Sequence, residues 1–461
     1  MKICKFGGSS LADGGRIKTV SEIILEKQKE KPVTVVLSAM KGVTDKLLKT
    51  ASLAEEGNNE YRGLVDELRQ THEQAIGELT EGGHADETRE KVGKLFKELE
   101  TVTQGIELIH ECSPRSLDLV ASFGERLSCT LFTGYLTSLG VEAWMLDSRN
   151  AVVTDNRYGN ASVIFTPTYE KLAKLLSENR GIPVVTGFIG STIDGSTTTL
   201  GRNGTDYTAS LVGAAVGAEQ VEIWTDVDGV LSSDPRLVEN AFVVPELNFQ
   251  EAMELSYFGA EVIHPSTLIP AVEKDIPVYI KNTMQPEAPG TRIARHVQPH
   301  NREITGIASI SDVSLVNIEG GGMIGVPGIA SRVFHALAQA GVNVIMISQA
   351  SSEHSICIVI RTKEAKRAIA GLQDELRQET ESKMIEGFDL MEKLEIVAVI
   401  GENMRGRPGI SGKLFSSLGS AGVNVLAIAQ GSSERNISFV IEEKDKKRAL
   451  ETIHRAFLEE I

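Results

Sequence analysis

The carboxyl-terminal third of the chain is an internal duplication, which constrains the fold more than any other feature of the sequence. Residues 313–376 and 394–457 repeat each other without a gap, and Pro327 corresponds to Pro408, an offset of 81 residues. Both copies carry Ala-Gly-Val-Asn-Val followed by Ser-Ser-Glu. Each copy, of roughly 65 residues, alternates strand-like and helical segments in the order βαββα, which predicts two small α+β domains of the ferredoxin-like type.

The strand-like segment EITGIAS, residues 303–309, precedes the first copy and has no counterpart before the second. It could complete the sheet of the second copy, in which case the first copy is inserted into the second. We therefore expect three domains, with limits at 1–297, 298–390 and 391–461.

A dinucleotide-like pattern, Gly320-x-Gly322-x-x-Gly325, follows a predicted strand in the first copy. Pro327 intervenes before the next helix, no acidic residue ends the following strand, and the equivalent segment GENMRG lacks the central glycine. The sequence therefore disfavours nicotinamide binding at this turn.

The first two thirds of the chain contain apolar segments typical of the buried strands of a parallel sheet. Several are followed by segments rich in Gly, Ser, Thr or Asp, at residues 7–8, 38–44, 190–206 and 225–236. The carboxyl ends of parallel strands lie at one edge of a sheet, where ligands of α/β proteins bind. These segments are therefore expected to form one site in a mainly parallel α/β domain.

The segment from Phe188 to Tyr207, FIGSTIDGSTTTLGRNGTDY, has the composition of a loop that approaches an anion. Missing side chains let amide groups reach a phosphate, and Arg202 can grip a carboxylate or phosphate with two parallel hydrogen bonds. A flexible linker is the alternative, but the segment stands between strand-like and helix-like sequence. The turn KFGGSS, before a helical segment, also suits phosphate, although a structural turn is nearly as consistent with it.

Composition argues against several other classes of protein. The net charge of −16 disfavours an extended nucleic-acid or anionic-membrane surface. Four cysteines without a CxxC pair, and nine histidines without an HxxxH or HExxH pattern, predict free thiols and no protein-built transition-metal site. The amino terminus turns polar too early for a signal peptide and no apolar run is long enough to cross a membrane, so a cytoplasmic protein is expected.

Two polar residues are ambiguous from their local sequence. Glu125, in SFGERLS, lies between apolar positions of a predicted helix, and spacing alone favours a solvated helix edge over a site residue. His264, before Pro265, is expected to be structural.

Seven motifs occur in the order found in aspartate kinases of the amino-acid kinase family, and the chain resembles these enzymes over nearly its whole length. The motifs are KFGGSS, SAMKGVTD, SFGERLS, STIDGSTTTLGRNGTDY, WTDVDGVLSSDPR, FGAEVIHP and KNTMQPEAPGT. The duplicated third resembles their tandem ACT domains, and its details are most similar to the kinase half of bifunctional aspartate kinase–homoserine dehydrogenases. No dehydrogenase half follows Ile461, so the resemblance implies a monofunctional kinase: a three-layer amino-acid-kinase sandwich followed by two ACT domains.

The resemblance implies that ATP phosphorylates the side-chain carboxylate of L-aspartate to give 4-phospho-L-aspartate, the first step towards lysine, threonine and methionine. A carboxylate is ionised at neutral pH, so no general base is needed, and the protein has to hold two anions in line and neutralise charge. The resemblance also implies a requirement for Mg²⁺, held mainly by ATP oxygens and water.

The resemblance assigns these roles position by position. Arg202 should clamp the aspartate α-carboxylate and Glu125 should pair with its ammonium group, which reverses the interpretation of Glu125 from spacing. Residues 190–199 should face the transferring phosphoryl group. The expected residues are Lys5, Arg202 and Asp206 for catalysis; Lys5, Gly7, Gly8, Ser9, Thr225, Asp226, Leu231 and Arg236 for ATP; and Ser38, Thr44, Glu125, Arg202, Gly204, Thr205 and Asp206 for aspartate.

Two positions depart from the family pattern. Glu261 stands where relatives often have a lysine near the phosphates, so either Lys5 and Arg236 suffice there or Glu261 points away. Leu231 replaces an aromatic residue often found near the base, which weakens the case for adenine stacking.

The paired ACT domains imply feedback control by an amino acid, with threonine favoured and lysine second. An effector can act only through different affinities for two states of the enzyme. Gln349 and Gln430, each ending a predicted strand, resemble effector-contacting positions, and Asn343 and Asn424 start the same strands, where they could also only cap turns. ACT faces commonly pair between chains, so a homodimer or homotetramer is expected.

Two alternatives remain open. A related amino-acid kinase could act on glutamate or acetylglutamate, but Glu125 with Arg202 favours a substrate that has a free ammonium group. The other alternative is a catalytically silent amino-acid sensor, which the Glu261 departure supports.

Overall fold

The computed structural model describes residues 1–258, 265–298, 302–349 and 354–459. Contacts divide the chain into two compact units, each described by itself below: Met1–Val230, Pro245–Phe249 and Glu261–Gln298 form the first, and Leu231–Val244, Gln250–Ala260 and Pro299–Ile461 the second. The finer limits expected for three domains stay a prediction. Among the described residues, no helix combines the length and the apolar character needed to cross a membrane.

The first unit is built on an eight-stranded sheet with the order β3-β5-β2-β1-β8-β10-β11-β9. Neighbouring strands from β3 to β10 are parallel, whereas β11 is antiparallel to β10. The central strands are continuous buried runs, as expected for a sheet covered on both faces, and the predicted mainly parallel α/β fold is confirmed. The strands are β1 (Lys2–Phe6), β2 (Val33–Leu37), β3 (Ala143–Leu146), β5 (Ile182–Thr186), β8 (Gln220–Thr225), β9 (Glu246–Asn248), β10 (Val278–Asn282) and β11 (Thr291–Ala294).

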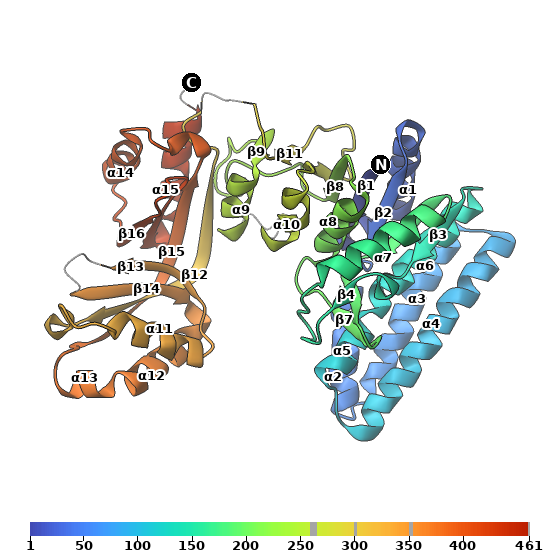
Figure 1. Ribbon diagram of the computed structural model, residues 1–461, viewed down its shortest axis with the longest axis horizontal. Coiled ribbons are helices and arrows are strands. Elements are labelled where there is room, and N and C mark those ends of the chain that lie inside the picture. Colours follow the sequence, from blue (N-terminus) through green and yellow to red (C-terminus); the bar gives the residue numbers. More distant parts are fainter. Residues whose placement is uncertain (259–264, 299–301, 350–353, 460–461) are drawn as a thin grey trace. The chain divides into compact units, whose positions relative to one another are not determined.

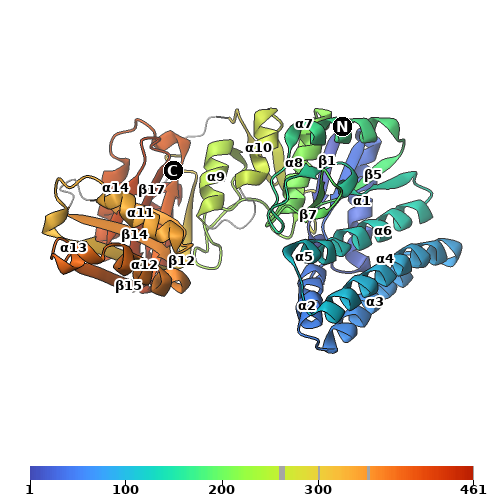
Figure 2. The same cartoon turned by 60° about the horizontal axis from the view of Figure 1, so that its bottom comes forward.

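Helices cover both faces of this sheet and make it the middle of three layers. On one face α8 packs against β1 and β8 and contacts α7 and α10; on the other, α1 and α6 pack against β2. Beyond them α3 and α4 lie side by side as a long antiparallel pair (Figures 1 and 2). The helices are α1 (Gly14–Glu30), α2 (Val43–Glu55), α3 (Glu60–Leu79), α4 (Gly82–Ile109), α5 (Pro114–Ala121), α6 (Phe123–Ser138), α7 (Phe165–Glu178), α8 (Gly204–Val216) and α10 (Pro265–Glu273).

Local sequence signals set several helix boundaries. The Asp13 side chain caps α1 by accepting the Arg16 N–H at 2.8 Å, and Ser113 caps α5 just before Pro114. Gly217, with φ of 59°, ends α8 in the left-handed conformation that glycine adopts at little cost. The positions of these helices along the chain are therefore encoded locally.

A separate three-stranded sheet of the first unit has the order β4-β6-β7, from β4 (Val153–Thr154), β6 (Ile189–Thr192) and β7 (Thr197–Thr199). β6 and β7 form an antiparallel hairpin in which Ile189 faces Thr199 and Ser191 faces Thr197. The Gly- and Thr-rich segment expected to be a loop is therefore partly a hairpin, because its β-branched residues suit paired strands.

The second unit is built on one six-stranded antiparallel sheet with the order β13-β14-β12-β15-β17-β16. Each sequence repeat shows the predicted βαββα order, which confirms two α+β repeats. The strands are β12 (Gly306–Glu319), β13 (Val344–Gln349), β14 (Ser355–Arg361), β15 (Gly387–Ile400), β16 (Ala427–Gln430) and β17 (Asn436–Glu442). The helices are α9 (Phe249–Tyr257), whose first residue belongs to the first unit, α11 (Ile329–Gln339), α12 (Ala365–Glu375), α13 (Arg377–Glu381), α14 (Ile410–Ser420) and α15 (Lys446–His454).

The strands β12 and β15 run through both repeats. Residues 313–319 of β12 pair with β14 of the first repeat, whereas residues 306–310 pair with residues 396–400 of the second repeat. In β15, residues 387–391 pair with the first repeat in the same way. Each repeat is thus completed by a strand segment adjoining the other.

The glycines of the dinucleotide-like turn have a packing role. A Cβ on Gly320 would lie 2.2 Å from the Met384 carbonyl oxygen, and one on Gly322 would lie 2.6 Å from Met384 Cα. The backbone of Met384 therefore passes too close for any side chain, a structural cause for the glycine pattern that involves no nucleotide.

Candidate active site

Four parallel strands of the first unit end in line. Phe6 at the end of β1 pairs with Leu37 of β2 and with Trp224 of β8, and Leu37 pairs with Thr186 of β5. The segments that follow these strands therefore meet at one edge of the sheet, where the sequence predicted a common site.

Lys5 and Asp206 form a buried ion pair at this edge. Lys5 on β1 is 9% exposed, Asp206 in the first turn of α8 is 5% exposed, and Lys5 Nζ lies 2.5 Å from Asp206 Oδ1. The positive end of the helix dipole also stabilises a carboxylate in this first turn. The pair fixes a cation where an arriving phosphate could take the place of the carboxylate.

The turn after β1 differs from the expected helix N-terminus. Residues 8–11 form a short 3₁₀ turn, and α1 begins only at Gly14, where the Asp13 carboxylate caps it. The helical segment expected after KFGGSS is confirmed as α1, but an acidic side chain caps its first turn, and a phosphate role for residues 7–9 stays a prediction. A Cβ on Gly8 would lie 3.0 Å from the Ala39 carbonyl oxygen, so residues 7–9 contribute closely packed backbone beside Lys5.

Glu125 is buried, which contradicts the solvated position expected from spacing alone. It is 2% exposed on α6, and its Oε1 accepts the Ala39 N–H at 3.1 Å. Gly124 allows this approach, because a Cβ there would lie 2.7 Å from Ala39 Cβ. Among the described residues Glu125 Oε2 has no hydrogen-bond partner, and burial raises the pKa of Glu125 to about 8. The free oxygen can accept a ligand cation.

Ser38 and Thr44 flank the same end of β2. The Ser38 N–H donates to the Phe6 carbonyl at 3.1 Å, and the Ser38 carbonyl accepts the Ser128 hydroxyl at 2.7 Å. Thr44 is half-buried in the first turn of α2, and its hydroxyl would lie 3.7 Å from a Cβ built on Gly124. Both residues are therefore next to the chain segments that hold Glu125.

The start of α8 carries the other residues expected to hold aspartate. Gly204 and Thr205 are buried there, and a Cβ on Gly187 would lie 2.3 Å from Thr205 Cγ2, so the chain leaving β5 passes directly against the helix. Arg202 is exposed and forms no ion pair within the described part of the chain. Its guanidinium group is available to an anion.

The threonine hydroxyls of the β6–β7 hairpin are bonded within the protein. Thr198 Oγ1 lies 2.7 Å from Thr154 Oγ1, and the Thr199 hydroxyl donates to Asp118 Oδ1 at 2.7 Å. Asp118 also accepts the N–H groups of Thr199 and Gly159. These side chains stiffen the hairpin, and the expectation that residues 190–199 face the transferring phosphoryl group stays a prediction.

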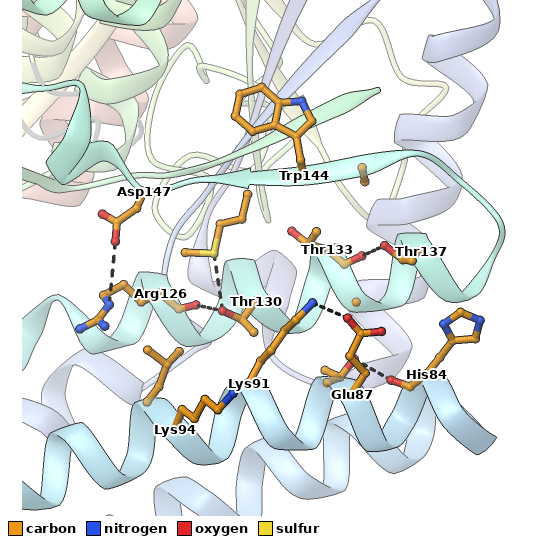
Figure 3. Close-up of a pocket in the computed structure, with 15 residues that line it drawn as sticks. His84, Glu87, Lys91, Lys94, Arg126, Thr130, Thr133, Thr137, Trp144 and Asp147 are labelled. Carbon is orange, nitrogen blue, oxygen red and sulfur yellow. Dashed lines mark hydrogen bonds and ion pairs between the residues drawn. The ribbon is translucent and has the colours of Figure 1, made fainter. Parts of the chain in front are cut away.

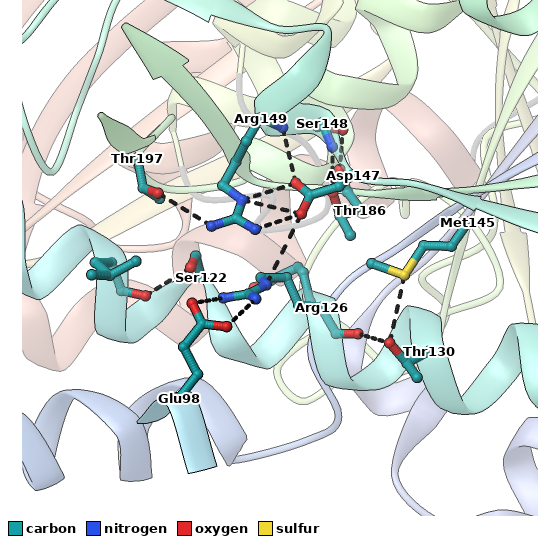
Figure 4. Close-up of polar contacts among 12 residues, drawn as sticks. Glu98, Ser122, Arg126, Thr130, Met145, Asp147, Ser148, Arg149, Thr186 and Thr197 are labelled. Carbon is teal, nitrogen blue, oxygen red and sulfur yellow. Dashed lines mark hydrogen bonds and ion pairs between the residues drawn. The ribbon is translucent and has the colours of Figure 1, made fainter. Parts of the chain in front are cut away.

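A chain of charged side chains supports the same hairpin (Figure 4). Arg126 of α6 pairs with Glu98 at 2.6 Å and approaches Asp147 to 4.0 Å, Asp147 pairs with Arg149 at 2.7 Å, and Arg149 donates to Thr197 Oγ1 at 3.4 Å. Sequence reasoning missed these contacts because they join residues of α4, α6, the segment after β3 and the hairpin, whose proximity depends on the packing of the fold.

The expected nucleotide contacts are divided between the two units. Thr225 ends β8 and its hydroxyl donates to Asp226 Oδ1 at 3.2 Å, and both residues belong to the first unit. Leu231 and Arg236 belong to the second unit, where Arg236 is exposed and pairs with Asp234 at 2.8 Å.

Glu261 and His264 lie outside the described residues. Within the described ranges there is no group of three or more His, Cys, Asp or Glu side chains able to hold a metal ion. A Mg²⁺ ion at the strand ends would therefore take most of its ligands from phosphate oxygens and water.

A cavity of about 550 Å³ lies between α4, α6 and β3, and none of the predicted site residues lines it (Figure 3). Its wall includes Lys91, which pairs with Glu87 at 2.7 Å, and the Arg126 and Asp147 side chains described above. Much of the charge in this wall is therefore compensated within the protein.

One predicted effector residue lines a cavity of the second unit. Gln349 ends β13 and borders a space of about 340 Å³, and Gln430 ends β16 at the equivalent position of the other repeat. The other lining residues are Met323, Gly325, Val326, Pro327, Gly328, Ile329, Ala330 and Ile356.

The predicted asparagines lie beside the same two strands. Asn343 immediately precedes β13, Asn424 stands three residues before β16, and both are exposed. The Ser348 hydroxyl donates to the Ile428 carbonyl at 2.9 Å, so the two edge strands that end in the glutamines approach each other.

Comparison with known proteins identifies the family. The amino acid kinase family matches residues 1–282, and the ACT domain matches residues 316–376 and 397–457. Bifunctional aspartokinase/homoserine dehydrogenase 1 of Arabidopsis thaliana is 35% identical over 460 residues, which cover 98% of this chain and 50% of that protein, so the chain spans about half the length of such relatives. Aspartokinase 1 of the same plant is 34% identical over 468 residues, covering 99% of this chain and 80% of that protein.

Solved structures are similar over nearly the whole chain. Escherichia coli aspartokinase III in complex with aspartate and ADP is 30% identical, with a TM-score of 0.81 and 99% of each chain covered. Clostridium acetobutylicum aspartate kinase is 27% identical, with a TM-score of 0.82, covering 99% of this chain and 100% of that one. The chain therefore belongs to the amino acid kinase family and carries two segments that match the ACT domain.

Proposed function

We propose that the protein phosphorylates the side-chain carboxylate of L-aspartate with ATP, giving ADP and 4-phospho-L-aspartate, the first step towards lysine, threonine and methionine. The observation that carries the proposal is the free carboxylate oxygen of buried Glu125, at the sheet edge that also holds the Lys5–Asp206 pair. Burial raises the pKa of this carboxyl, and the ammonium group of an amino acid bound beside it would stabilise the ionised form, whereas an N-acetylated substrate would leave it without a cationic partner. E. coli aspartokinase III, a structural relative, has been solved with aspartate and ADP.

Positioning and charge neutralisation account for the chemistry. The attacking carboxylate is already ionised, so the protein has to bring two anions together and stabilise charge on the transferring group. Lys5, released from Asp206 by the arriving phosphates, would bind phosphoryl oxygens, and Arg202 would clamp the α-carboxylate. Gly7, Gly8, Ser9, Thr225, Asp226 and Arg236 are proposed to hold the nucleotide, and Ser38, Thr44, Gly204 and Thr205 to complete the aspartate pocket. Mg²⁺ bound to the phosphates would supply further charge neutralisation.

Hydroxamate formation tests this function. With ATP, Mg²⁺ and hydroxylamine, the protein should convert L-aspartate to its hydroxamate, and chelation of Mg²⁺ should stop the reaction. Turnover of acetylglutamate with none of aspartate would refute the proposal. Aspartate-dependent thermal stabilisation without turnover of any of these acids would instead favour a silent sensor.

We propose that an amino acid bound to the ACT repeats inhibits the enzyme, with threonine favoured and lysine second. The position of Gln349 on the 340 Å³ cavity supports a small ligand there. Lysine stays in consideration because E. coli aspartokinase III has also been solved with lysine and aspartate. Titrating each amino acid against hydroxamate formation decides the order, and inhibition by lysine alone would reverse it.

We propose assembly into a homodimer or homotetramer through the ACT repeats. The exposed residues on and at the ends of β13 and β16 support contact of these strands with a second chain. Light scattering should give two or four times the chain mass, and a monomer at micromolar concentration would contradict the proposal. A cytoplasmic location without nucleic-acid or membrane partners stays a prediction.

A further inference from the structure

Residues 231–244, here called the Ser232 loop, pack into the core of the second repeat although they come from earlier in the chain. Val238 is 2% exposed within a cluster that includes Leu450 and Ile453 of α15. The Phe242 ring lies 5.9 Å from the His454 ring, centroid to centroid. The loop is therefore part of the hydrophobic core around α15.

A buried chain of hydrogen bonds fixes the loop to the end of α15. Ser232 Oγ accepts the Phe242 N–H at 3.1 Å and lies 3.0 Å from His454 Nε2, while His454 Nδ1 lies 2.7 Å from Glu459 Oε1. A carboxylate only accepts, so Nδ1–H donates to Glu459, while Nε2 is within hydrogen-bond distance of the Ser232 hydroxyl. The side-chain hydrogen bond from His454 also lowers the pKa of Glu459. The Ser232 carbonyl accepts the Ile307 N–H at 2.8 Å, which ties the loop to β12 as well.

This order of Ser, His and Glu resembles a hydrolytic triad, but its burial assigns it a different role. Ser232 and His454 are both 0% exposed, so no substrate reaches the hydroxyl. Buried polar side chains of this kind fix one geometry, because losing a partner leaves the other unsatisfied away from water.

The first repeat shows that the burial of His454 is not a general property of the repeat fold. The offset of 81 residues places Gln373 of α12 at the position of His454, and Gln373 is exposed. The two positions differ because the Ser232 loop covers α15. A buried histidine is therefore found in the repeat whose last helix is covered by the Ser232 loop.

We propose that His454 is a positioning residue for the nucleotide: the last helix of the second ACT repeat holds the Ser232 loop, which carries Arg236. Only residues 227–230 separate this loop from Asp226 at the end of β8. Fixing Ser232 therefore restricts the loop that carries Arg236, the proposed nucleotide contact of this unit. This inference rests on the proposed function, and it makes nucleotide affinity dependent on the regulatory repeat.

Calorimetric titration with ADP and Mg²⁺, without aspartate, tests the inference. His454→Gln and Ser232→Ala should each weaken ADP binding about tenfold, as expected for an unsatisfied buried group. The KM for ATP should rise in parallel, while the KM for aspartate and kcat at saturating ATP stay within about twofold. Unchanged ADP affinity in both variants would overturn the inference.

Matched controls separate positioning from general loss of stability. His72→Gln replaces another fully buried histidine, which contacts Leu68 in α3, and Gln373→Ala changes the equivalent site of the first repeat; both should bind ADP as wild type does. Glu459 lies at the more exposed end of this series of hydrogen bonds. If the buried variants fail to fold, Glu459→Ala should still weaken ADP binding about threefold, and Glu459→Gln should restore the affinity.

The proposed function can fail separately. If wild-type protein binds ADP but does not phosphorylate aspartate, the proposed function is refuted. The ADP affinities of the His454 and Ser232 variants then still decide whether His454 positions the nucleotide site. Wild-type protein that binds no ADP contradicts both.

Discussion

The site at the strand ends and the effector positions of the repeats hold their functional groups in opposite ways. Lys5, Glu125 and Asp206 carry ionisable groups and are 9%, 2% and 5% exposed, whereas Gln349 and Gln430 are neutral and exposed. Burial of an ionisable group is costly, and here Lys5 pairs with Asp206 while the pKa of Glu125 is raised. The difference teaches that the fold fixes the proposed catalytic side chains in place, whereas the proposed effector residues lie exposed at strand ends.

The largest effect is expected from removing the buried cation Lys5, which tests the proposed catalytic role of the site at the strand ends. Lys5→Met should lower kcat by about a thousandfold, because a fixed charge at the transferring phosphoryl group is lost. Lys2→Met on the same strand, where Lys2 pairs with Glu30, is the control and should keep near-normal kcat. Hydroxamate kinetics with melting curves for each variant provide the measurement. A Lys5→Met enzyme within tenfold of wild type would show that the buried pair is structural.

The exposed arginine at the same site should affect binding rather than turnover. Arg202→Ala should raise the KM for aspartate by about a hundredfold, because a charge-assisted pair with the α-carboxylate is lost, and should leave the KM for ATP nearly unchanged. Arg157→Ala, at another exposed arginine of the first unit, serves as the control. Equal effects on both substrates would refute the clamp.

The raised pKa of Glu125, about 8, predicts pH dependence with a defined sign. The carboxyl must be ionised to pair with an ammonium group, so the KM for aspartate should fall about tenfold per pH unit well below pH 8 and level off above it. Because burial raises this pKa in the folded state, its contribution to stability is present below the ordinary carboxyl pKa and is lost as pH rises towards 8.

Glu125→Gln separates these two effects. Its KM for aspartate should be high and independent of pH, and its melting temperature should exceed that of wild type increasingly between about pH 5 and pH 8. A wild-type KM that does not change over this range would contradict a role for Glu125 in binding ammonium.

The smallest effects are expected in the repeats, where they test whether the exposed glutamines contact the effector. Gln349→Ala should raise the threonine concentration for half-inhibition about fivefold, because one side-chain hydrogen bond is lost, with kcat unchanged in the absence of effector. Gln430→Ala, at the equivalent position of the second repeat, shows whether both repeats bind. Unchanged inhibition in both variants would place the effector elsewhere.

The sequence predicted the site best where the ionisable residues lie at the end of a strand or soon after it. Lys5 lies in a strand before glycines, and Asp206 starts a helix after a Gly-rich segment, so parallel strands were enough to bring the segments together. Glu125 was misplaced by spacing, because periodicity describes one helix at a time. It cannot show that Gly124 lets α6 approach Ala39 closely enough to bury the next side chain.

The supports of the site were harder to predict. The charged chain from Glu98 through Arg126 to Arg149 joins residues whose proximity depends on the complete packing of α4, α6 and the hairpin. The hairpin itself had a usable signal, since three consecutive threonines favour a strand, but the glycine content suggested a loop.

The two long strands of the second unit have a consequence for folding. β12 and β15 are each 14 residues long and supply backbone hydrogen bonds to both repeats. Unfolding of one repeat would leave an open strand edge on the other, so we expect the two repeats to unfold together. If the chain were truncated after the first repeat, residues 306–310 would form an unpaired strand edge, which favours aggregation. Duplication here has joined two copies through the backbone hydrogen bonds of two shared strands.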